Sequence, residues 1–185
     1  LLAHLEKIVQ YNVQSSEKEK FDGVMLDIEP YISDSWKENP EEYMDRYISC
    51  MKKGYKFAQK NHLRTAICIP RHYDNQGLTS GLEELIKETC DEVAVMNYSC
   101  GNEIEAIRTE AALSEKYGKE LHCILEFQEV GKHGLTENKT YRNKGIDNAK
   151  ETWEKLQKEY KNINVTRDYH WSRPVREMLE EKNAD

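Results

Sequence analysis

The sequence has no long apolar run. No stretch approaches the roughly 20 consecutive apolar residues that a membrane-spanning helix needs, and mean hydropathy is −0.88. It also has no excess of basic residues, since 27 Lys and Arg stand against 34 Asp and Glu, for a formal charge of −7. Binding to a polyanion requires clustered Lys and Arg. We therefore expect a soluble domain whose partners include no nucleic acid and no membrane.

The five cysteines occur without a CxxC or CxxH pair, and the six histidines occur without HxH or HExxH spacing. Such spacing is typical of zinc sites. We expect the cysteines to be small buried hydrophobes and the chain to use no metal and no cofactor. The alternative is a metal-dependent hydrolase, with four candidate ligands: Asp27, Glu29, His72 and His170. The cysteines do not settle the compartment, for which a secreted or cell-surface location is favoured over the cytoplasm.

Apolar runs predict five strands, at residues 21–29, 63–70, 92–98, 121–127 and 165–171. Amphipathic stripes between them predict helices at 1–13, from 40 onward, at 80–90, 103–117 and 145–160, and a last helix from 172. Expected N-caps are Asn39, Ser80 and Asn102. A strand, helix and strand repeat without hairpin turns indicates right-handed parallel crossovers.

The fold class predicted from this repeat is α/β, as a (β/α)8 TIM-type barrel. No glycine-rich phosphate loop follows any strand, which weakens an open nucleotide-binding sheet. A full barrel takes about 250 residues, so residues 1–185 would form a single domain, the C-terminal five β/α units, with the N-terminal units missing. A partial barrel leaves strand edges unpaired. Upstream chain or a partner is therefore expected to complete it.

Two carboxylates, Asp27 and Glu29, end the apolar strand at 24–28. Residues two apart point to the same face of a strand, and the carboxyl ends of barrel strands converge on one site. This pattern predicts an acid and its helper. The alternative is a pair of solvated carboxylates where the strand leaves the sheet.

Tyr31 follows the same strand, with Trp36 further downstream, and the other strand ends also carry polar and aromatic residues: Arg71, His72, Asn97, Tyr98, Glu126, His170 and Trp171. Aromatic faces can stack on the apolar faces of sugar rings, so Tyr31, Trp36, Tyr98 and Trp171 are candidate stacking surfaces if the substrate is a carbohydrate. Trp153 has helical spacing with apolar neighbours and is expected in the core. Residues 130–144 form a long connection after the fourth strand, which is typical of a lid or binding loop.

The first strand resembles a known signature. Asp22-Gly23-x-x-x-Asp27-x-Glu29 is similar to the DGxDxDxE motif of family 18 glycoside hydrolases, the chitinase and endo-N-acetylglucosaminidase group, where it forms barrel strand four. Met96-x-Tyr98 resembles strand six of that family, and Trp171 resembles the aromatic residue that ends strand eight. Two positions depart from the pattern: Met25 replaces the middle Asp, and Ser99 replaces the Asp after the tyrosine. The longer text FDGVMLDIEPY is closer still to uncharacterised bacterial glycosidase-like barrel proteins.

The resemblance implies hydrolysis of a glycosidic bond without a protein nucleophile. Glu29 would protonate the glycosidic oxygen while the N-acetyl group of the substrate attacks the anomeric carbon. Asp27 would orient that group, and Tyr98 would donate a hydrogen bond to its oxygen. The expected substrate contacts are Tyr31, Trp36, Arg71, His72, Asn97, His170 and Trp171.

Two alternatives stay open at this point. Glu126, three strands after Glu29, resembles the nucleophile of clan A retaining glycosidases; otherwise it forms a salt bridge to a base such as Arg71. The second alternative is a carbohydrate-binding barrel without activity, because Met25 lacks the acid that the family has at this position.

Overall fold

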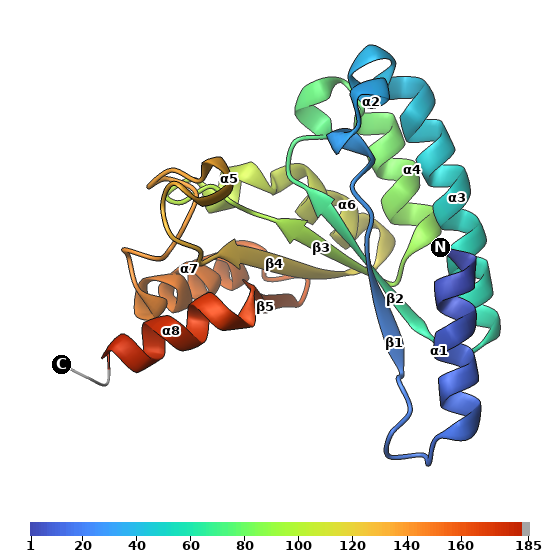
Figure 1. Cartoon of the computed structure of the whole chain (residues 1–185). Helices are drawn as coiled ribbons and strands as arrows, with labels where there is room; N and C mark the ends of the chain where they lie inside the picture. The colour runs from blue at the N-terminus through green and yellow to red at the C-terminus, as the bar shows by residue number, and fades with distance from the viewer. Residues whose placement is uncertain (183–185) are drawn as a thin grey trace. The chain divides into compact units, whose positions relative to one another are not determined.

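The computed structural model describes residues 1–182 and shows a mixed α/β fold with one sheet of five parallel strands (Figure 1). The strands lie in the sheet in chain order: β1 (Gly23–Asp27), β2 (Arg64–Pro70), β3 (Glu92–Met96), β4 (Glu120–Glu126) and β5 (Val165–His170). All five predicted strands are confirmed, with small differences at their ends. The parallel α/β class is confirmed with them.

The helices lie between the strands and after the last one. They are α1 (Leu2–Gln14), α2 (Asp34–Glu38), α3 (Pro40–Lys60), α4 (Thr79–Thr89), α5 (Glu103–Ala106), α6 (Arg108–Tyr117), α7 (Ile146–Glu159) and α8 (Ser172–Lys182), with 3-10 turns η1 (Pro30–Ile32), η2 (Asp74–Gln76) and η3 (Lys132–Gly134). The chain divides into two compact units, unit 1 (Leu1–Val93) and unit 2 (Ala94–Asp185). Among residues 1–182, no helix has the length and apolar character needed to cross a membrane. All five cysteines are free thiols, and three of them are buried.

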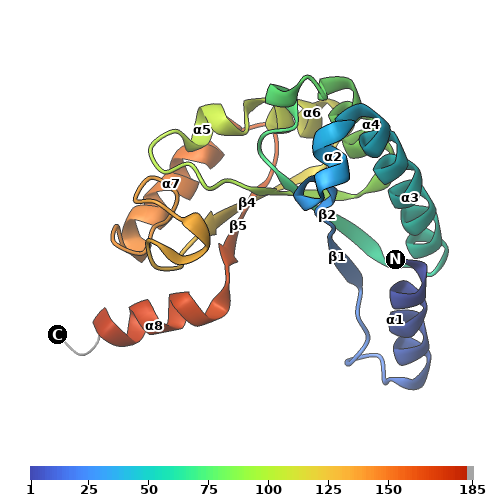
Figure 2. The same cartoon turned by 45° about the horizontal axis from the view of Figure 1, so that its top comes forward.

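In unit 1, helix α3 begins as the sequence predicts. Asn39 is the N-cap residue and its side-chain oxygen accepts the backbone N–H of Glu42 (3.4 Å), while Pro40 takes the first helical position. The buried residues of α3 recur every three or four positions: Met44, Tyr47, Ile48, Met51, Gly54 and Ala58. Helix α3 packs against β2 and α4, and α1 packs against α3 (Figure 2).

The start of α4 differs from the prediction. Ser80 is not its N-cap: the helix begins at Thr79, and Leu78 precedes it without a side-chain cap. Gly81 lies inside the helix because α3 approaches closely there. A Cβ at Gly81 would lie 2.6 Å from Cγ of Met44, so the glycine serves helix packing rather than the cap.

In unit 2, Trp153 of α7 holds the helix against the sheet. Its side chain is 1% exposed, and its indole N–H donates to the carbonyl of Cys123 in β4 (3.0 Å). Its ring packs against Phe127 and Tyr169, with centroids 6.4 and 5.2 Å away. The core position predicted for Trp153 is confirmed.

The predicted helix 103–117 is in fact two helices, α5 and α6, separated at Ile107 (φ −125°). In a continuous helix the carbonyl of Ile104 would accept the N–H of Arg108. Here that carbonyl accepts the hydroxyl of Tyr160, which follows α7, at 2.5 Å. Asn102 takes the expected N-cap position, but its side chain makes no cap hydrogen bond.

The long connection at 130–144 is anchored by buried side chains. The backbone N–H of Tyr141 donates to the carbonyl of Glu126 (2.8 Å), and the Tyr141 hydroxyl donates to Glu103. The Thr140 hydroxyl donates to the carbonyl of Gln128 (2.7 Å). This part of the connection is therefore fixed to the end of β4, and a lid or binding role for 130–144, whose residues 130–134 and 136–139 are exposed, stays a prediction.

Candidate functional site

The end of β1 carries the two predicted carboxylates of unit 1. Asp27 is exposed, as is Met25 two residues earlier, whose side chain is 51% exposed. Glu29 is half-buried just after the strand, and its Oε1 accepts a hydrogen bond from the hydroxyl of Tyr31. The chain turns directly after Glu29, because Pro30 begins η1 and the N–H of Ile32 bonds to the Glu29 carbonyl (3.3 Å). This turn brings the side chain of Tyr31 back to that of Glu29.

The hydroxyl of Tyr31 acts as a permanent donor. Burial, and then the hydrogen bond to Glu29, raise the pKa of Tyr31 above its ordinary value. The hydroxyl therefore keeps its proton at neutral pH, and Oε1 of Glu29 is the acceptor.

Aromatic rings pack behind Tyr31. Its ring meets His72 edge-on (5.3 Å) and lies 6.1 Å from Tyr73. The pKa of His72 is lowered, first by burial and then by the charge of Arg71, so the imidazole is neutral at neutral pH. We call Asp27, Glu29, Tyr31 and His72 the Glu29 cluster.

Trp36 does not fit its predicted role as a sugar-stacking surface. Its side chain is 3% exposed in the short helix α2, and it packs against Tyr73 at 5.5 Å. No pattern in the sequence indicated α2; its N-cap is Ser33, whose hydroxyl accepts the N–H of Trp36 (3.2 Å). The short capped helix α2 thus places the side chain of Trp36 in the core.

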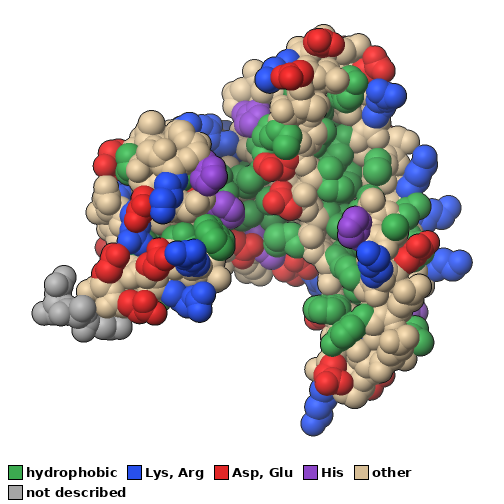
Figure 3. Space-filling model, viewed as in Figure 1, with side chains coloured by type: hydrophobic (Ala, Val, Ile, Leu, Met, Phe, Trp, Pro, Cys, Tyr) green, Lys and Arg blue, Asp and Glu red, His purple; other side chains and the backbone are tan. Residues whose placement is uncertain are grey.

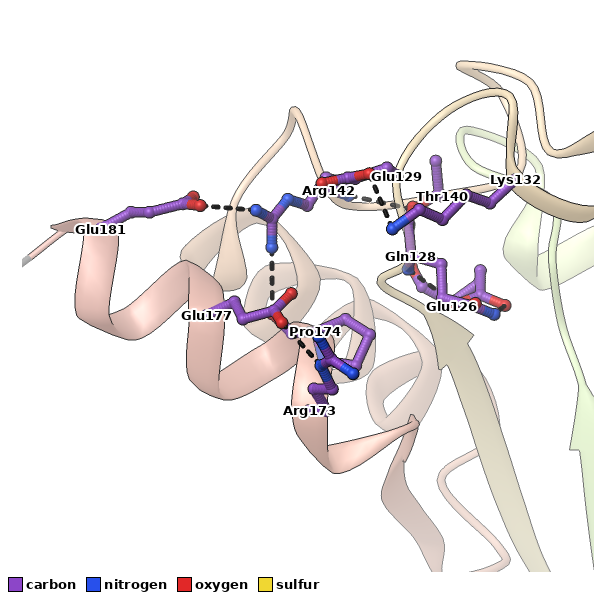
Figure 4. A network of polar contacts seen from close by, with 10 residues as sticks. All are labelled: Glu126, Gln128, Glu129, Lys132, Thr140, Arg142, Arg173, Pro174, Glu177 and Glu181. Atoms are coloured by element: carbon purple, nitrogen blue, oxygen red, sulfur yellow. Dashed lines mark hydrogen bonds and ion pairs between the residues drawn. The ribbon is translucent and has the colours of Figure 1, made fainter.

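In unit 2, Glu126 and His170 face each other across neighbouring strands. The register of β4 and β5 pairs these two residues, and Nδ1 of His170 lies 2.8 Å from Oε2 of Glu126. Oε1 of Glu126 accepts the backbone N–H groups of Phe127 (2.7 Å) and Gln128 (2.8 Å), and Oε2 also accepts the Gln128 side chain (3.2 Å; Figure 4). The Tyr98 ring lies against His170 at 5.8 Å. We call Tyr98, Glu126, Gln128 and His170 the Glu126 cluster.

The hydrogen bonds decide the charge of Glu126. Burial by itself raises the pKa of this carboxyl group, but the hydrogen bonds from His170 and from the Gln128 backbone outweigh it, so the pKa of Glu126 lies below its ordinary value. Glu126 is therefore ionised at neutral pH and only accepts. Nδ1 of His170 must then be the donor.

This geometry does not fit Glu126 as a nucleophile. Its side chain is 2% exposed, and each oxygen already accepts two hydrogen bonds. A nucleophilic oxygen has to reach an anomeric carbon, which a buried and fully engaged carboxylate does not do. Its salt-bridge partner in unit 2 is His170, in the place of the arginine that the sequence suggested.

We expect the free energy of unfolding of Glu126→Gln to decrease less steeply than that of the wild type as pH falls. A depressed native pKa gives stability that is complete above the unfolded value of about 4.5 and is lost as pH falls through the lower native pKa. Urea unfolding at pH 7, 5, 4 and 3 should therefore show a smaller loss for Glu126→Gln than for the wild type. His170→Gln should also reduce the loss, because it removes one bond that lowers this pKa. Equal acid sensitivity in all three proteins would contradict the assignment.

Asn97 also departs from its predicted role in substrate binding. It is buried, and its side-chain amide donates to the carbonyl of Glu103 (2.9 Å) and to Sγ of Cys123 (3.5 Å). Strand parity explains this, because Asn97 points to the opposite face from Met96 and Tyr98. The amide anchors the segment after β3.

Trp171 is exposed directly after β5, following a cis peptide bond. It lines a small hollow of about 120 Å³ with Gln128, Arg142 and Arg173. Figure 4 shows the ion pairs around it: Lys132–Glu129 (2.8 Å), Arg142–Glu181 (2.6 Å) and Arg173–Glu177 (2.8 Å). Ligand pockets are usually about 300 to 1,000 Å³, so this hollow is too small to hold a sugar by itself.

A larger cavity of about 640 Å³ lies elsewhere in unit 2, between α5 and α7. The carboxylate of Glu103 on its wall accepts the Tyr141 hydroxyl and the N–H of Gly101 (2.8 Å). Among the described residues, no side chain predicted for the site lines this cavity. Its lining carries no sequence motif, which is why the sequence analysis did not find it.

No protein-family model, no curated protein and no solved structure matches this chain. The resemblance to family 18 glycoside hydrolases therefore rests on the residues of the sequence alone. In the view of Figure 3, acidic, basic and histidine side chains are intermixed on the surface of both units. The two candidate sites are the Glu29 cluster in unit 1 and the Glu126 cluster in unit 2.

Proposed function

We propose that this protein is a glycoside hydrolase in which Glu29 is the general acid. One observation carries the proposal: Glu29 is half-buried at the carboxyl end of a parallel strand, and the Tyr31 hydroxyl fixes one of its oxygens. Sites of parallel α/β proteins lie at the carboxyl ends of their strands. The second oxygen, Oε2, would carry the transferred proton.

The proposed reaction uses the substrate as its own nucleophile. Glu29 donates its proton to the glycosidic oxygen as the bond from that oxygen to C1 breaks, and the acetamido oxygen of the substrate bonds to C1. Water then attacks C1 as the bond from C1 to the acetamido oxygen breaks, and one proton of that water passes to Glu29, which frees the sugar with its acetamido group restored. Asp27, exposed two residues earlier, would accept the acetamido N–H. The role of Tyr98 as a donor to the acetamido oxygen stays a prediction.

The state of Glu126 supports this mechanism over a retaining clan A mechanism. A protein nucleophile needs an accessible carboxylate oxygen, and Glu126 is buried with both oxygens engaged. Substrate-assisted attack needs no protein nucleophile. The proposal therefore requires an N-acetylated sugar.

We further propose that the sheet belongs to a (β/α)8 TIM-type barrel. Supporting features are the sequential order of five parallel strands and the helices between them. β1 is an edge strand of the sheet, and its residue Met25 is 51% exposed. We expect further structure to cover this strand in a complete barrel. Upstream chain or a partner protein would supply that cover.

The alternative is a carbohydrate-binding barrel without activity. The observation that favours it is Met25, an exposed thioether where the resembling family has an acid that interacts with its neighbouring carboxylates. A thioether cannot share a proton with Asp27. Under this alternative the clusters would bind sugars by hydrogen bonding and aromatic contact alone.

A substrate screen separates the two functions. The full chain would be tested with chromogenic glycosides in matched pairs, one member with a 2-acetamido group and one with a 2-hydroxyl group, beside a glycan array. We expect release of the chromophore from acetamido substrates only. Cleavage of the hydroxyl members at the same rate would contradict substrate assistance, and array binding without any cleavage would establish the binding alternative.

A further inference from the structure

We infer that the cavity between α5 and α7 in unit 2 is a binding site for a 2-amino sugar, whose ammonium group contacts the carboxylate of Glu103. The inference rests on residues of unit 2 and does not depend on the Glu29 cluster or on the proposed hydrolysis. The cavity has a volume of about 640 Å³, within the usual range of about 300 to 1,000 Å³ for ligand pockets. It therefore has room for a saccharide, which the hollow beside Trp171 does not.

The carboxylate of Glu103 indicates the charge of the ligand. Its side chain lines the cavity although the residue is only 8% exposed. Oε1 accepts the N–H of Gly101 (2.8 Å) and the hydroxyl of Tyr141. Among residues 1–182, no group donates to Oε2 and no cationic side chain pairs with Glu103, and Oε2 keeps access to the cavity. A largely buried carboxylate is costly unless it is paired, so a cationic donor is the group that complements this oxygen.

The carboxylate is held in place before a ligand binds. Burial, and then the hydrogen bond to Glu103, raise the pKa of Tyr141, so its hydroxyl keeps its proton and donates to Oε1. The side-chain amide of Asn97 donates to the backbone carbonyl of Glu103 (2.9 Å). The carbonyl of the next residue, Ile104, accepts the hydroxyl of Tyr160 (2.5 Å). Because these bonds fix the wall of the cavity, a ligand has little ordering to induce, which favours affinity.

The other charges on the wall favour a ligand with a single positive charge. Lys144, Lys155 and Glu159 also line the cavity, and none of them forms an ion pair with another described residue. Burial raises the pKa of the Cys100 thiol to about 11, while the charge of Lys144 lowers it and that of Glu103 raises it. Both charges therefore lie near a thiol that is neutral at neutral pH. The two lysines would repel a polyamine, and the two glutamates would repel an anionic ligand.

One face of α7 offers partners for a ligand rich in hydroxyl groups. Four polar residues that line the cavity recur there every three or four positions: Asn148, Thr152, Lys155 and Glu159. Their amide, hydroxyl, ammonium and carboxylate groups together donate and accept hydrogen bonds, as the hydroxyls of a sugar do. Ile104 from α5 adds an apolar side chain to the wall. One ammonium group on a ring with several neutral hydroxyls, the composition of a 2-amino sugar, matches this lining.

The ligand is tested by titrating the full chain, labelled with ¹³C in its isoleucine methyl groups, at pH 6. Ile104 lines the cavity, and the variant Ile104→Val identifies its signal. Glucosamine should shift this signal saturably and leave that of Ile8 in α1 in place. Glucose and N-acetylglucosamine have the same ring without the ammonium group and should bind at least about tenfold more weakly, because a hydrogen bond to a charged group is lost. Spermidine, a polyamine without hydroxyls, should also bind more weakly. An unshifted Ile104 signal with glucosamine, or equal or tighter binding of any of the other three ligands, would overturn the inference.

The role of Glu103 is tested by Glu103→Gln. The amide oxygen can still accept from Tyr141 and Gly101, while an NH₂ group replaces Oε2 at the cavity. Glucosamine should then bind about 10- to 100-fold more weakly. The control is Glu151→Gln, the same change on an exposed part of α7 outside the lining, which should keep the affinity within about twofold.

Thermal unfolding would establish that both variants are folded. Equal affinity of Glu103→Gln and the wild type for glucosamine would overturn the inference. If Glu103→Gln does not fold, the comparison of glucosamine with glucose in the wild type decides it.

The outcomes also separate this inference from the proposed function, because binding is measured without turnover. A saturable shift of the Ile104 signal by glucosamine, in a protein that cleaves no glycoside, would support this site and contradict the proposed hydrolysis. Cleavage of acetamido glycosides without any shift at Ile104 would support the hydrolysis and overturn this site.

Discussion

Glu29→Gln is expected to lower kcat on acetamido glycosides by about 10² to 10⁴, with little change in KM. Proton transfer by a positioned side chain contributes about this factor, and glutamine keeps the shape of the side chain without an acidic proton. The hydrogen bond from Tyr31 to Oε1 can be kept by the amide oxygen. The fold should therefore survive, and the loss should fall on the chemical step.

The matched control is Glu41→Gln, in the exposed first turn of α3. It makes the same chemical change outside the cluster and should leave kcat within about twofold. Thermal unfolding followed by circular dichroism would confirm that both variants are folded. Full activity of Glu29→Gln, or an equal loss in both variants, would remove Glu29 as the general acid.

Trp153→Ala is expected to lower the free energy of unfolding by about 3 to 5 kcal/mol, the usual cost of truncating a buried aromatic side chain. Trp153 is 1% exposed, and its ring packs against Phe127 and Tyr169. The substitution also removes the indole N–H that donates to the carbonyl of Cys123, a residue of the β4–β5 ladder. Guanidinium unfolding at pH 7 measures the change.

Trp153→Phe is the matched control, because it keeps an aromatic ring and removes the indole N–H. Its cost should be smaller, about 0.5 to 1.5 kcal/mol, the net contribution of one hydrogen bond. A loss below about 1 kcal/mol for Trp153→Ala would show that α7 is not held to the sheet by this residue.

The strands could be predicted because their signal is local. β2 and β3 in particular are short apolar runs between polar residues, and each of the five strands is predicted within a few residues of its observed ends. The start of α3 was equally local, since Asn39 and Pro40 carry the cap and the first-turn preference in adjacent positions. The division of α5 from α6 was not local. At this break the carbonyl of Ile104 accepts both the N–H of Ile107 (3.4 Å) and the hydroxyl of Tyr160, 56 residues later in the chain.

For the candidate site, the sequence indicates where residues lie relative to the strands better than it indicates their burial and their partners. Strand parity predicts that Asp27 and Glu29 point to one face; Asp27 is the last residue of β1 and Glu29 lies two residues beyond it, so their common direction stays a prediction. Asn97 could have been assigned to the opposite face by the same parity rule. The burial of Trp36 and of Glu126 could not, because burial depends on packing from distant segments. The partner of Glu126 likewise follows from the register of β4 and β5, which the sequence does not contain.

The dependence of the rate on the leaving group tests the central claim most directly. A general acid matters most for a poor leaving group, which needs a proton, and least for one that departs as an anion. Wild type and Glu29→Gln would be compared on two N-acetylglucosaminides, one with a 2,4-dinitrophenyl leaving group and one with a 4-methylumbelliferyl leaving group. We expect the loss in Glu29→Gln to be at least tenfold smaller on the dinitrophenyl substrate. The same loss on both substrates would contradict proton donation by Glu29.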